Sequence, residues 1–180
     1  MRIIGGKLRG LRINPPANLP VRPTTDLAKE ALFNILNNLV DLEDIKVLDL
    51  FSGTGSISLE FASRGAIEVV SVDKDFNCCK FQKQTAEKLQ LTQIDVNRTD
   101  TFKFLEVETN SYDIIFADPP FDKEAEFRAL PALFRPILAP QGMAIIQFPT
   151  RTPPEWVEDV DKVKRYGESS LAFFNAEHGD

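Results

Sequence analysis

Asp49-Leu50-Phe51-Ser52-Gly53-Thr54-Gly55 is the stretch that decides the fold of this chain. It includes the end of a short apolar run, Lys46–Phe51, and it leads into a helix-like segment, Ser56–Arg64. Glycine tolerates the backbone angles of a tight turn, and the N–H groups at the start of a helix attract anionic or polar ligands. The stretch therefore predicts a strand, a glycine turn and a helix, as at the ligand-binding edge of an α/β protein.

Strand-like and helix-like segments alternate after this stretch. Further strands are expected at Glu68–Val72, Ile94–Asn97, Tyr112–Ala117, Gly142–Phe148, Val160–Tyr166 and Leu171–Asn175. Further helices are expected at Phe76–Leu91 and at Glu124–Leu138, the second with a proline interruption. Such alternation produces a parallel sheet with helices on both faces. We therefore expect a Rossmann-like, mainly parallel seven-stranded sheet that closes with an antiparallel hairpin.

Residues 1–40 follow a different pattern and are expected to form an N-terminal extension. Two strand-like pieces, Arg2–Ile4 and Leu11–Ile13, flank a glycine-bounded turn and predict a hairpin. A proline-rich connector follows and excludes a helix there. Apolar residues then recur at helical spacing from Leu27 to Leu39, after good N-cap residues at Thr24–Asp26. We expect this extension to pack on a main domain at 41–180.

The charges of the chain are segregated. With 21 Lys and Arg against 27 Asp and Glu, the net charge of −6 argues against a nucleic-acid partner. Residues 1–25, however, hold five basic side chains and no acidic one. A basic arm on an acidic body indicates a polyanionic partner, and a solvated N-terminal segment is the alternative. The basic residues of this arm are Arg2, Lys7, Arg9, Arg12 and Arg22.

The cysteines and the histidine predict neither a disulfide nor a metal site. Cys78 and Cys79 are adjacent in a helix-like stretch, and His178 lies in a tail that we expect to be solvated. No apolar run reaches the roughly 18 residues that a membrane span needs, and the N-terminus has no signal-peptide core. We therefore expect a soluble, cytoplasmic monomer with no membrane contact and no metal.

Acidic residues on both sides of the glycine turn indicate an adenosine-containing cofactor. Asp49 precedes the turn, and Asp73 follows the next strand, 20 residues beyond Gly53. A carboxylate at that place commonly holds the hydroxyl pair of a ribose. A dinucleotide fingerprint would require glycine at position 58, where this chain has Ser58. A tight turn with no ligand is the structural alternative for Gly53 and Gly55.

Asp118-Pro119-Pro120-Phe121 follows the strongly apolar strand at 112–117. The two prolines make a stiff turn with few backbone donors. The carboxylate of Asp118 and the carbonyl of Pro119 could accept both N–H bonds of an exocyclic amine, while its ring stacks on Phe121. The alternative is a proline turn with a core phenylalanine. We interpret the motif as a site for a planar substrate that bears an amino group.

Together these two motifs resemble motifs I and IV of class I S-adenosylmethionine-dependent methyltransferases that act on amino nitrogens. Met1–Gly10 and Arg22–Asp26 are similar to the start of the RsmD-type small-subunit rRNA guanine-N2 methyltransferases, as are Lys29-Glu30 and Leu32–Asn34 after them. The resemblance covers nearly the whole chain. It departs from the family pattern at 27–28, in having Asp73 where Glu is more frequent, and from 160 onward.

The resemblance implies a role for each motif. It places the cofactor S-adenosylmethionine, and its product S-adenosylhomocysteine, against Asp49, Phe51, Gly53, Thr54, Gly55, Asp73, Lys74, Asp100 and Thr25. Asp73 would hold the ribose, Asp100 would lie near the adenine amine or cap a helix, and Thr25 would close over the cofactor. It implies catalysis by Asp118, Pro119, Pro120 and Phe121, and RNA binding by Arg2, Lys7, Arg9, Arg12 and Arg22. The partner would be small-subunit ribosomal RNA or the assembling small subunit.

The expected reaction is direct in-line transfer of a methyl group to the N2 amine of a guanine that is extruded into the site. Three alternatives stay open. The acceptor could be adenine N6 or a protein glutamine, because each offers a planar amino group. The same sheet could serve a nicotinamide-dependent oxidoreductase, which Ser58 and the Asp118–Phe121 motif disfavour. The chain could also be an RNA-binding module without catalysis.

Overall fold

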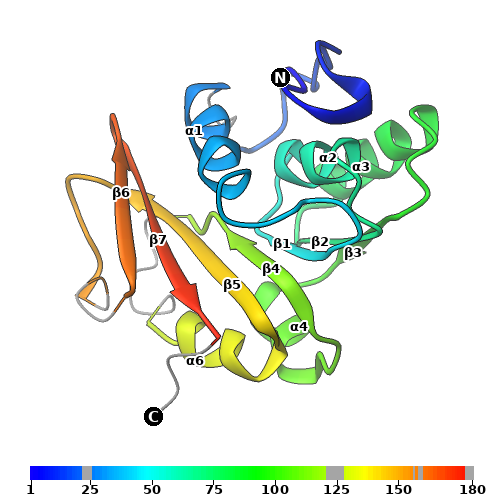
Figure 1. Cartoon of the computed structure of the whole chain (residues 1–180). Helices are drawn as coiled ribbons and strands as arrows, with labels where there is room; N and C mark the ends of the chain where they lie inside the picture. The colour runs from blue at the N-terminus through cyan, green and yellow to red at the C-terminus, as the bar shows by residue number, and fades with distance from the viewer. Residues whose placement is uncertain (22–25, 121–127, 156, 158–159, 177–180) are drawn as a thin grey trace.

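The computed structural model describes residues 1–21, 26–120, 128–155, 157 and 160–176 (Figure 1). In this part of the chain seven strands form one sheet in the order β3-β2-β1-β4-β5-β7-β6. The strands are β1 (Lys46–Leu50), β2 (Glu68–Asp73), β3 (Ile94–Arg98), β4 (Tyr112–Ala117), β5 (Leu138–Pro149), β6 (Lys162–Tyr166) and β7 (Ser169–Asn175). β1 to β5 pair in parallel, and β7 is antiparallel to both β5 and β6. The expected mainly parallel sheet with a closing hairpin is therefore confirmed.

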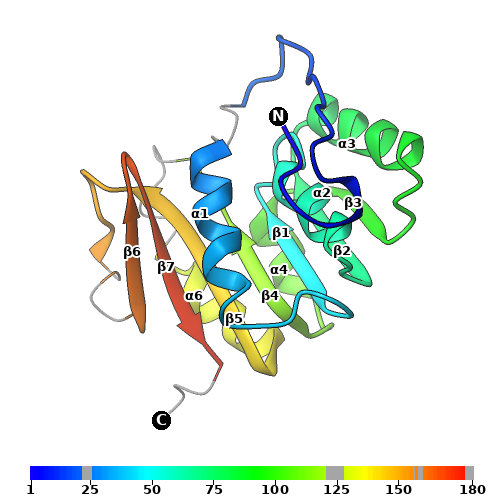
Figure 2. The same cartoon turned by 45° about the horizontal axis from the view of Figure 1, so that its top comes forward.

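Helices cover both faces of the sheet. They are α1 (Asp26–Leu36), α2 (Ser56–Ser63), α3 (Phe76–Lys88), α4 (Thr101–Val107) and α6 (Leu130–Phe134), with 3-10 turns η1 (Gly6–Leu8) and η2 (Arg135–Ile137). Alternation along β1 sends Val47 to one core and Leu48 to the other. Phe33 of α1 and Phe61 of α2 belong to the first core, with ring centroids 4.8 Å apart. Figure 2 shows α1 in front of the sheet and α4 and α6 behind it.

The segment at 124–138 differs from the helix that the sequence predicts. Its residues 124–127 lie outside the described part, and residues 130–137 form the short α6 and then η2. Pro131 stands at the start of α6, where its missing N–H is harmless, and Pro136 stands in the first turn of η2. Leu138 is not helical but begins β5, four residues before the expected strand. Proline therefore divides one expected helix into two short turns.

Residues 1–13 of the N-terminal arm form a minimal hairpin. Arg2 and Arg12 make one antiparallel bridge, and η1 occupies the turn between them. The backbone of Ile3 donates to Leu11 O over 2.9 Å and accepts from Gly10 N over 2.8 Å. The chain then runs through the proline-rich linker to α1. The division into an extension at 1–40 and a domain at 41–180 stays a prediction.

None of the helices in the described residues combines the length and the apolar character that crossing a membrane requires.

Candidate active site

The candidate site lies at the carboxyl edge of the sheet, where β1 runs between β2 and β4. The order of the strands reverses between β1 and β4, which is the position where open α/β sheets bind their ligands. The last register pairs join Leu50 to Val72 on one side and to Ala117 on the other. The residues at the next position of each strand are therefore neighbours at this edge, and they are Phe51, Asp73 and Asp118.

The glycine turn after β1 has backbone angles that are strained for most residues other than glycine. Phe51, Gly53 and Gly55 have φ values of 57°, 53° and 73°, in the left-handed region. A Cβ on Gly55 would lie 2.9 Å from Cγ of Gln82, which is too close for a carbon contact. Positive φ at the bulky Phe51 is uncommon and marks a site whose strain the surrounding structure supports. The conformation of the turn thus fixes the orientation of its N–H groups at the start of α2.

Asp49 lies beneath this turn and is buried, with 1% of its surface exposed. The backbone N–H of Ser58 donates to its Oδ2 over 3.0 Å, and Ser58 Oγ lies 2.5 Å from the same oxygen. Burial raises the pKa of Asp49 to about 7, the Ser58 contacts oppose the rise, and the negative charges of Asp118 and Asp73 add to it. Among the described residues, Oδ1 of Asp49 has no hydrogen-bond partner.

Asp73 connects the end of β2 to the glycine turn. Its Oδ2 accepts from Gly53 N over 2.8 Å, and its Oδ1 accepts from Asp75 N over 2.8 Å. A carboxylate has about four lone-pair positions, so both oxygens retain capacity for an external hydroxyl pair. The neighbouring Lys74 is exposed. This geometry is compatible with the role in ribose binding that the sequence predicts for Asp73.

Asp100, after β3, caps α4. Its Oδ1 accepts from Phe102 N over 3.0 Å and from Lys103 N over 3.3 Å. The ring of Phe102 meets that of Phe51 edge-on, with centroids 6.4 Å apart. The helix-capping interpretation of Asp100 is therefore confirmed, while its proximity to an adenine amine stays a prediction.

Asp118 follows β4 and is half-buried. Its Oδ1 accepts a hydrogen bond of 3.1 Å from Nε2 of Gln147, on the neighbouring β5. Desolvation raises the pKa of Asp118 to about 7, and the bond from Gln147 opposes the rise. Pro119 is buried and Pro120 exposed. The predicted stacking residue, Phe121, lies outside the described residues.

The basic residues of the arm that the structure describes are all exposed: Arg2, Lys7, Arg9 and Arg12. Arg2 Nε lies 3.6 Å from the Asp26 carboxylate, in a solvent-exposed pair. The arm reaches the glycine turn itself, because Thr54 Oγ1 lies 3.6 Å from the sulfur of Met1. Two further residues with expected roles, Arg22 and Thr25, lie outside the described part.

Several polar residues of the site region were missed from the sequence. Gln147 and Ser71 interrupt apolar strands, at Ile145–Phe148 and Val69–Val72, and a lone polar residue in a buried strand is the signal that could have found them. Gln82 shares the buried face of α3 with Cys78, one turn earlier. Val21, before the undescribed 22–25, lies against Gly53, with its Cγ1 3.4 Å from where a Cβ would be.

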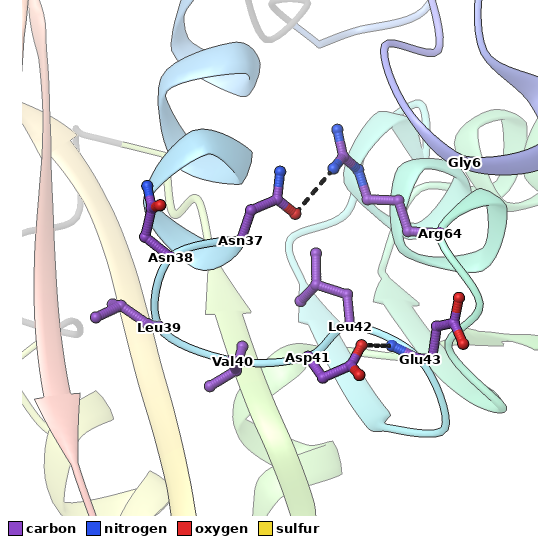
Figure 3. A pocket seen from close by; sticks show the side chains of 9 residues that line it. All are labelled: Gly6, Asn37, Asn38, Leu39, Val40, Asp41, Leu42, Glu43 and Arg64. Carbon is purple, nitrogen blue, oxygen red and sulfur yellow. Dashed lines mark hydrogen bonds between the residues drawn. The ribbon is translucent and has the colours of Figure 1, made fainter.

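A cavity of about 590 Å³ lies away from this site (Figure 3). Residues 37–43, which come before β1, form most of its wall, and Arg64 at the end of α2 and Gly6 of the arm complete it. Arg64 donates to Asn37 Oδ1 over 3.1 Å across it. Because these loops lead into the amino ends of β1 and β2, the cavity is at the opposite edge of the sheet from Asp118.

The chain is similar in sequence to a known protein family and to proteins named as rRNA methyltransferases. The family described as conserved hypothetical protein 95 matches residues 1–175. The ribosomal RNA small subunit methyltransferase D of Buchnera aphidicola subsp. Baizongia pistaciae is 38% identical over 124 residues, which are 67% of this chain and 61% of that protein. The putative rRNA methyltransferase YlbH of Bacillus subtilis is 31% identical, over 97% of this chain and 98% of that one.

A solved structure, the putative methyltransferase yhhF from Escherichia coli, superposes with a TM-score of 0.81 at 25% identity and covers 97% of both chains. The expected methyltransferase fold is thereby confirmed. The match to this chain spans 61% of the length of the Buchnera relative and nearly the whole of the Bacillus one.

Proposed function

We propose that this chain, which belongs to the family described as conserved hypothetical protein 95, is an S-adenosylmethionine-dependent methyltransferase of ribosomal RNA. The acceptor would be the N2 amine of a guanine in small-subunit RNA, and the enzyme would act as a monomer in the cytoplasm. The name of the Buchnera relative supports the substrate class. The observation that carries the proposal is the acid Asp118, held by Gln147 one strand away from the glycine turn.

The residues around the turn fit the cofactor. Oδ1 of the buried Asp49, which has no hydrogen-bond partner in the described part of the chain, suits a cationic or polar ligand, and Asp73 retains acceptor capacity for a hydroxyl pair. A Cβ at Gly53 would make an ordinary 3.4 Å contact with Val21, so the positive φ of 53° rather than lack of space favours glycine there. We infer that Asp49, Gly53, Gly55 and Asp73 hold the cofactor.

S-adenosylmethionine supplies, when bound, a methyl group on a cationic sulfur that leaves as a neutral thioether. Asp118 then has two tasks toward the acceptor amine. Its ionised carboxylate accepts an N–H bond and turns the nitrogen lone pair away from the guanine ring. It also stabilises the positive charge that grows on that nitrogen. Gln147 fixes the carboxylate for both tasks, because its amide holds Oδ1.

The exposed charges of the arm support an RNA substrate. Phosphate contacts by Lys and Arg provide most of the affinity of many nucleic-acid complexes. A base inside a helix or loop must be extruded to reach Asp118, at a cost of a few kcal/mol, and phosphate contacts would offset that cost. The arm is well placed for this, since Met1 touches Thr54 of the glycine turn.

The decisive experiment is to incubate the protein with labelled S-adenosylmethionine and unmodified small ribosomal subunits, free rRNA, or DNA. Digestion and nucleoside mass analysis should identify N2-methylguanine from the RNA. N6-methyladenine, or transfer to a protein glutamine, would overturn the guanine assignment. For the cofactor, a ligand at 100 times its Kd should stabilise the fold by about 2.7 kcal/mol. Stabilisation by NADH alone would favour an oxidoreductase instead.

A further inference from the structure

A chain of buried polar side chains connects Asp49 to the interior of the sheet and back to the glycine turn. Ser58 Oγ lies 2.5 Å from Asp49 Oδ2 and 3.0 Å from Ser71 Oγ. Ser71 Oγ in turn lies 2.5 Å from Oε1 of Gln82. All four side chains, which we call the polar chain, are at most 3% exposed. Their hydrogen bonds must therefore be satisfied within the protein.

The glycine turn determines the direction of the polar chain at its Gln82 end. The carbonyl oxygen of Gly53 lies 2.7 Å from the amide of Gln82, and a carbonyl only accepts hydrogen bonds. The amide nitrogen must therefore face Gly53, and it also donates to Ser52 Oγ over 2.9 Å. The Ser52 hydroxyl has its own acceptor, Val72 O, at 3.2 Å. Oε1 of Gln82 consequently faces Ser71 and accepts its hydroxyl proton.

The number of protons along the polar chain bears on the state of Asp49. Because Ser71 gives its one proton to Gln82, it can only accept from Ser58. If Ser58 gives its one hydroxyl proton to Ser71, the 2.5 Å contact between Ser58 Oγ and Asp49 Oδ2 needs a proton from Asp49; if Ser58 gives it to Asp49 instead, the 3.0 Å contact between the two serines has none. With Asp49 ionised, three oxygen–oxygen contacts would share two protons. With Asp49 protonated, each contact has one.

We propose that the polar chain holds Asp49 as a neutral carboxylic acid in the ligand-free protein, and that Gln82 is the positioning residue that imposes this state. The backbone N–H of Ser58 donates to Oδ2 in either state and does not change the count.

The electrostatic surroundings of Asp49 act in the same direction. The charged groups of described residues that influence it are Asp73, from the end of β2, and Asp118, from the end of β4, and both are acidic. Lys29, a buried cation on the packed helix α1, is engaged by Glu60 at 3.7 Å and by Ser56 at 3.1 Å. Burial raises the pKa of Asp49 to about 7, in agreement with the proton count.

The neutral acid has a consequence for ligand binding, which rests on the proposed function. S-adenosylmethionine is a cation, and a cation in this site favours the ionised form of Asp49. Binding should therefore release the proton of Asp49 when the pH is below about 7. Ionisation would let Ser58 turn its hydroxyl toward Asp49 and would leave Ser71 bonded to Gln82 alone. The loop that Gln82 holds through Gly53 stays anchored in both states.

The first test needs no ligand. Carbon-13 NMR should follow the carboxyl signal of Asp49 with pH, assigned by its loss in Asp49→Asn, and should find a midpoint near pH 7. Gln82→Leu removes the acceptor for Ser71, so that the serines can reverse their direction and both donate toward an ionised Asp49. Its midpoint should fall by about one pH unit, the equivalent of roughly 1 kcal/mol for one hydrogen bond. Ser71→Ala should also lower it.

Gln93→Leu is the matched control, because Gln93 donates to Ala62 O over 3.2 Å and makes no hydrogen bond with the polar chain, all of whose members are described. Its midpoint should equal that of the unaltered protein. A merely structural role for Gln82 predicts the opposite sign, since a more apolar neighbour raises the pKa of a carboxyl group. A wild-type midpoint below pH 5, or a rise or no change in Gln82→Leu and Ser71→Ala, would overturn the proposal.

The second test is calorimetry of S-adenosylmethionine binding at pH 6.5 in two buffers of different ionisation enthalpy. The unaltered protein should release up to about 0.75 proton from Asp49 on binding, and Gln82→Leu should release less. Binding with no proton release would overturn the coupling to Asp49. If Asp49 titrates near pH 7 and S-adenosylmethionine does not bind, the neutral acid is supported and the proposed function fails.

Discussion

Lys29 and Glu60 form an ion pair inside the protein, with Nζ 3.7 Å from Oε2 and side chains that are 1% and 0% exposed. The pair fastens the N-terminal arm to the fold. Glu60 accepts the backbone N–H groups of Ile4 and Gly5 over 2.9 and 2.7 Å, and Lys29 donates to the carbonyl of Arg2. The arm that carries the basic side chains is thus held by buried charges.

Removing the carboxylate should detach the arm. Glu60→Ala leaves Lys29 as an unpaired buried cation and should lower the free energy of unfolding by about 3–5 kcal/mol. Glu60→Gln, which keeps one acceptor oxygen, should lose less. Denaturant unfolding measures the loss, and hydrogen exchange at Ile4 and Gly5 reports the arm. Glu87→Ala, on the exposed face of α3, is the control. Unchanged protection of both amides in Glu60→Gln and Glu60→Ala would contradict this account.

Asp118 should contribute to methyl transfer and little to cofactor affinity. Asp118→Asn removes the negative charge that stabilises the developing cation, so the transfer rate should fall by roughly 10²–10³. Calorimetry should find S-adenosylmethionine affinity within about threefold of normal, a difference below roughly 1 kcal/mol. Asp95→Asn, an exposed aspartate on β3, serves as the matched control. Near-normal transfer by Asp118→Asn in a protein that binds cofactor would show that the site lies elsewhere.

The rate of transfer should rise with pH. Because the ionised form of Asp118 accepts the amine hydrogen and its pKa is raised to about 7, kcat at saturating cofactor should fall about tenfold per pH unit below 7 and level off above it. Gln147→Leu removes the hydrogen bond that opposes the rise and should move the midpoint to higher pH. Initial rates between pH 5.5 and 8.5 provide the measurement, and a flat profile would refute the assignment.

Asp49 should make the stability of the ligand-free protein depend on pH. Its pKa is raised from an ordinary value of 3.8 to about 7 in the folded protein. The folded protein therefore holds this proton more tightly than the unfolded chain does. The resulting contribution to the free energy of unfolding is complete below about pH 4. It is lost as the pH rises to 7, at up to about 1.4 kcal/mol per pH unit. Asp49→Asn cannot ionise, so its stability relative to wild type should increase across this window. Thermal unfolding of both proteins at pH 4.5–8 provides the measurement. Parallel plots of stability against pH for wild type and Asp49→Asn would contradict a raised pKa at Asp49.

The charges of the arm should govern RNA affinity. Neutralising Arg2, Lys7, Arg9 and Arg12 to glutamine should weaken rRNA binding and reduce the slope of log affinity against log salt by about 3, at roughly 0.7–0.9 per charge. Cofactor affinity should not change. The control neutralises Lys80, Lys83, Lys88 and Lys103, which are exposed on α3 and α4. Equal salt slopes for the two variants would remove the arm from the RNA interface.

Local patterns were enough to predict most elements. The apolar runs of β1 and β4, the glycine turn at 51–55 and the capping of α4 by Asp100 depend on side-chain period and on bonds a few residues apart. Segment 124–138 failed because apolar spacing alone does not decide whether a proline-containing run continues as a helix. There Pro131 and Pro136 produced α6 and η2, and Leu138 entered the sheet.

The sequence by itself determined the fold class and the motifs Asp49–Gly55 and Asp118–Phe121, because strand period, glycine turns and proline turns act over short distances. Only the tertiary structure decided which polar groups hold those motifs. Gln82 reaches Gly53 across 29 residues, Gln147 reaches Asp118 across 29, and Glu60 reaches Gly5 across 55. Strand order and helix packing bring these groups together, and burial then makes each hydrogen bond obligatory.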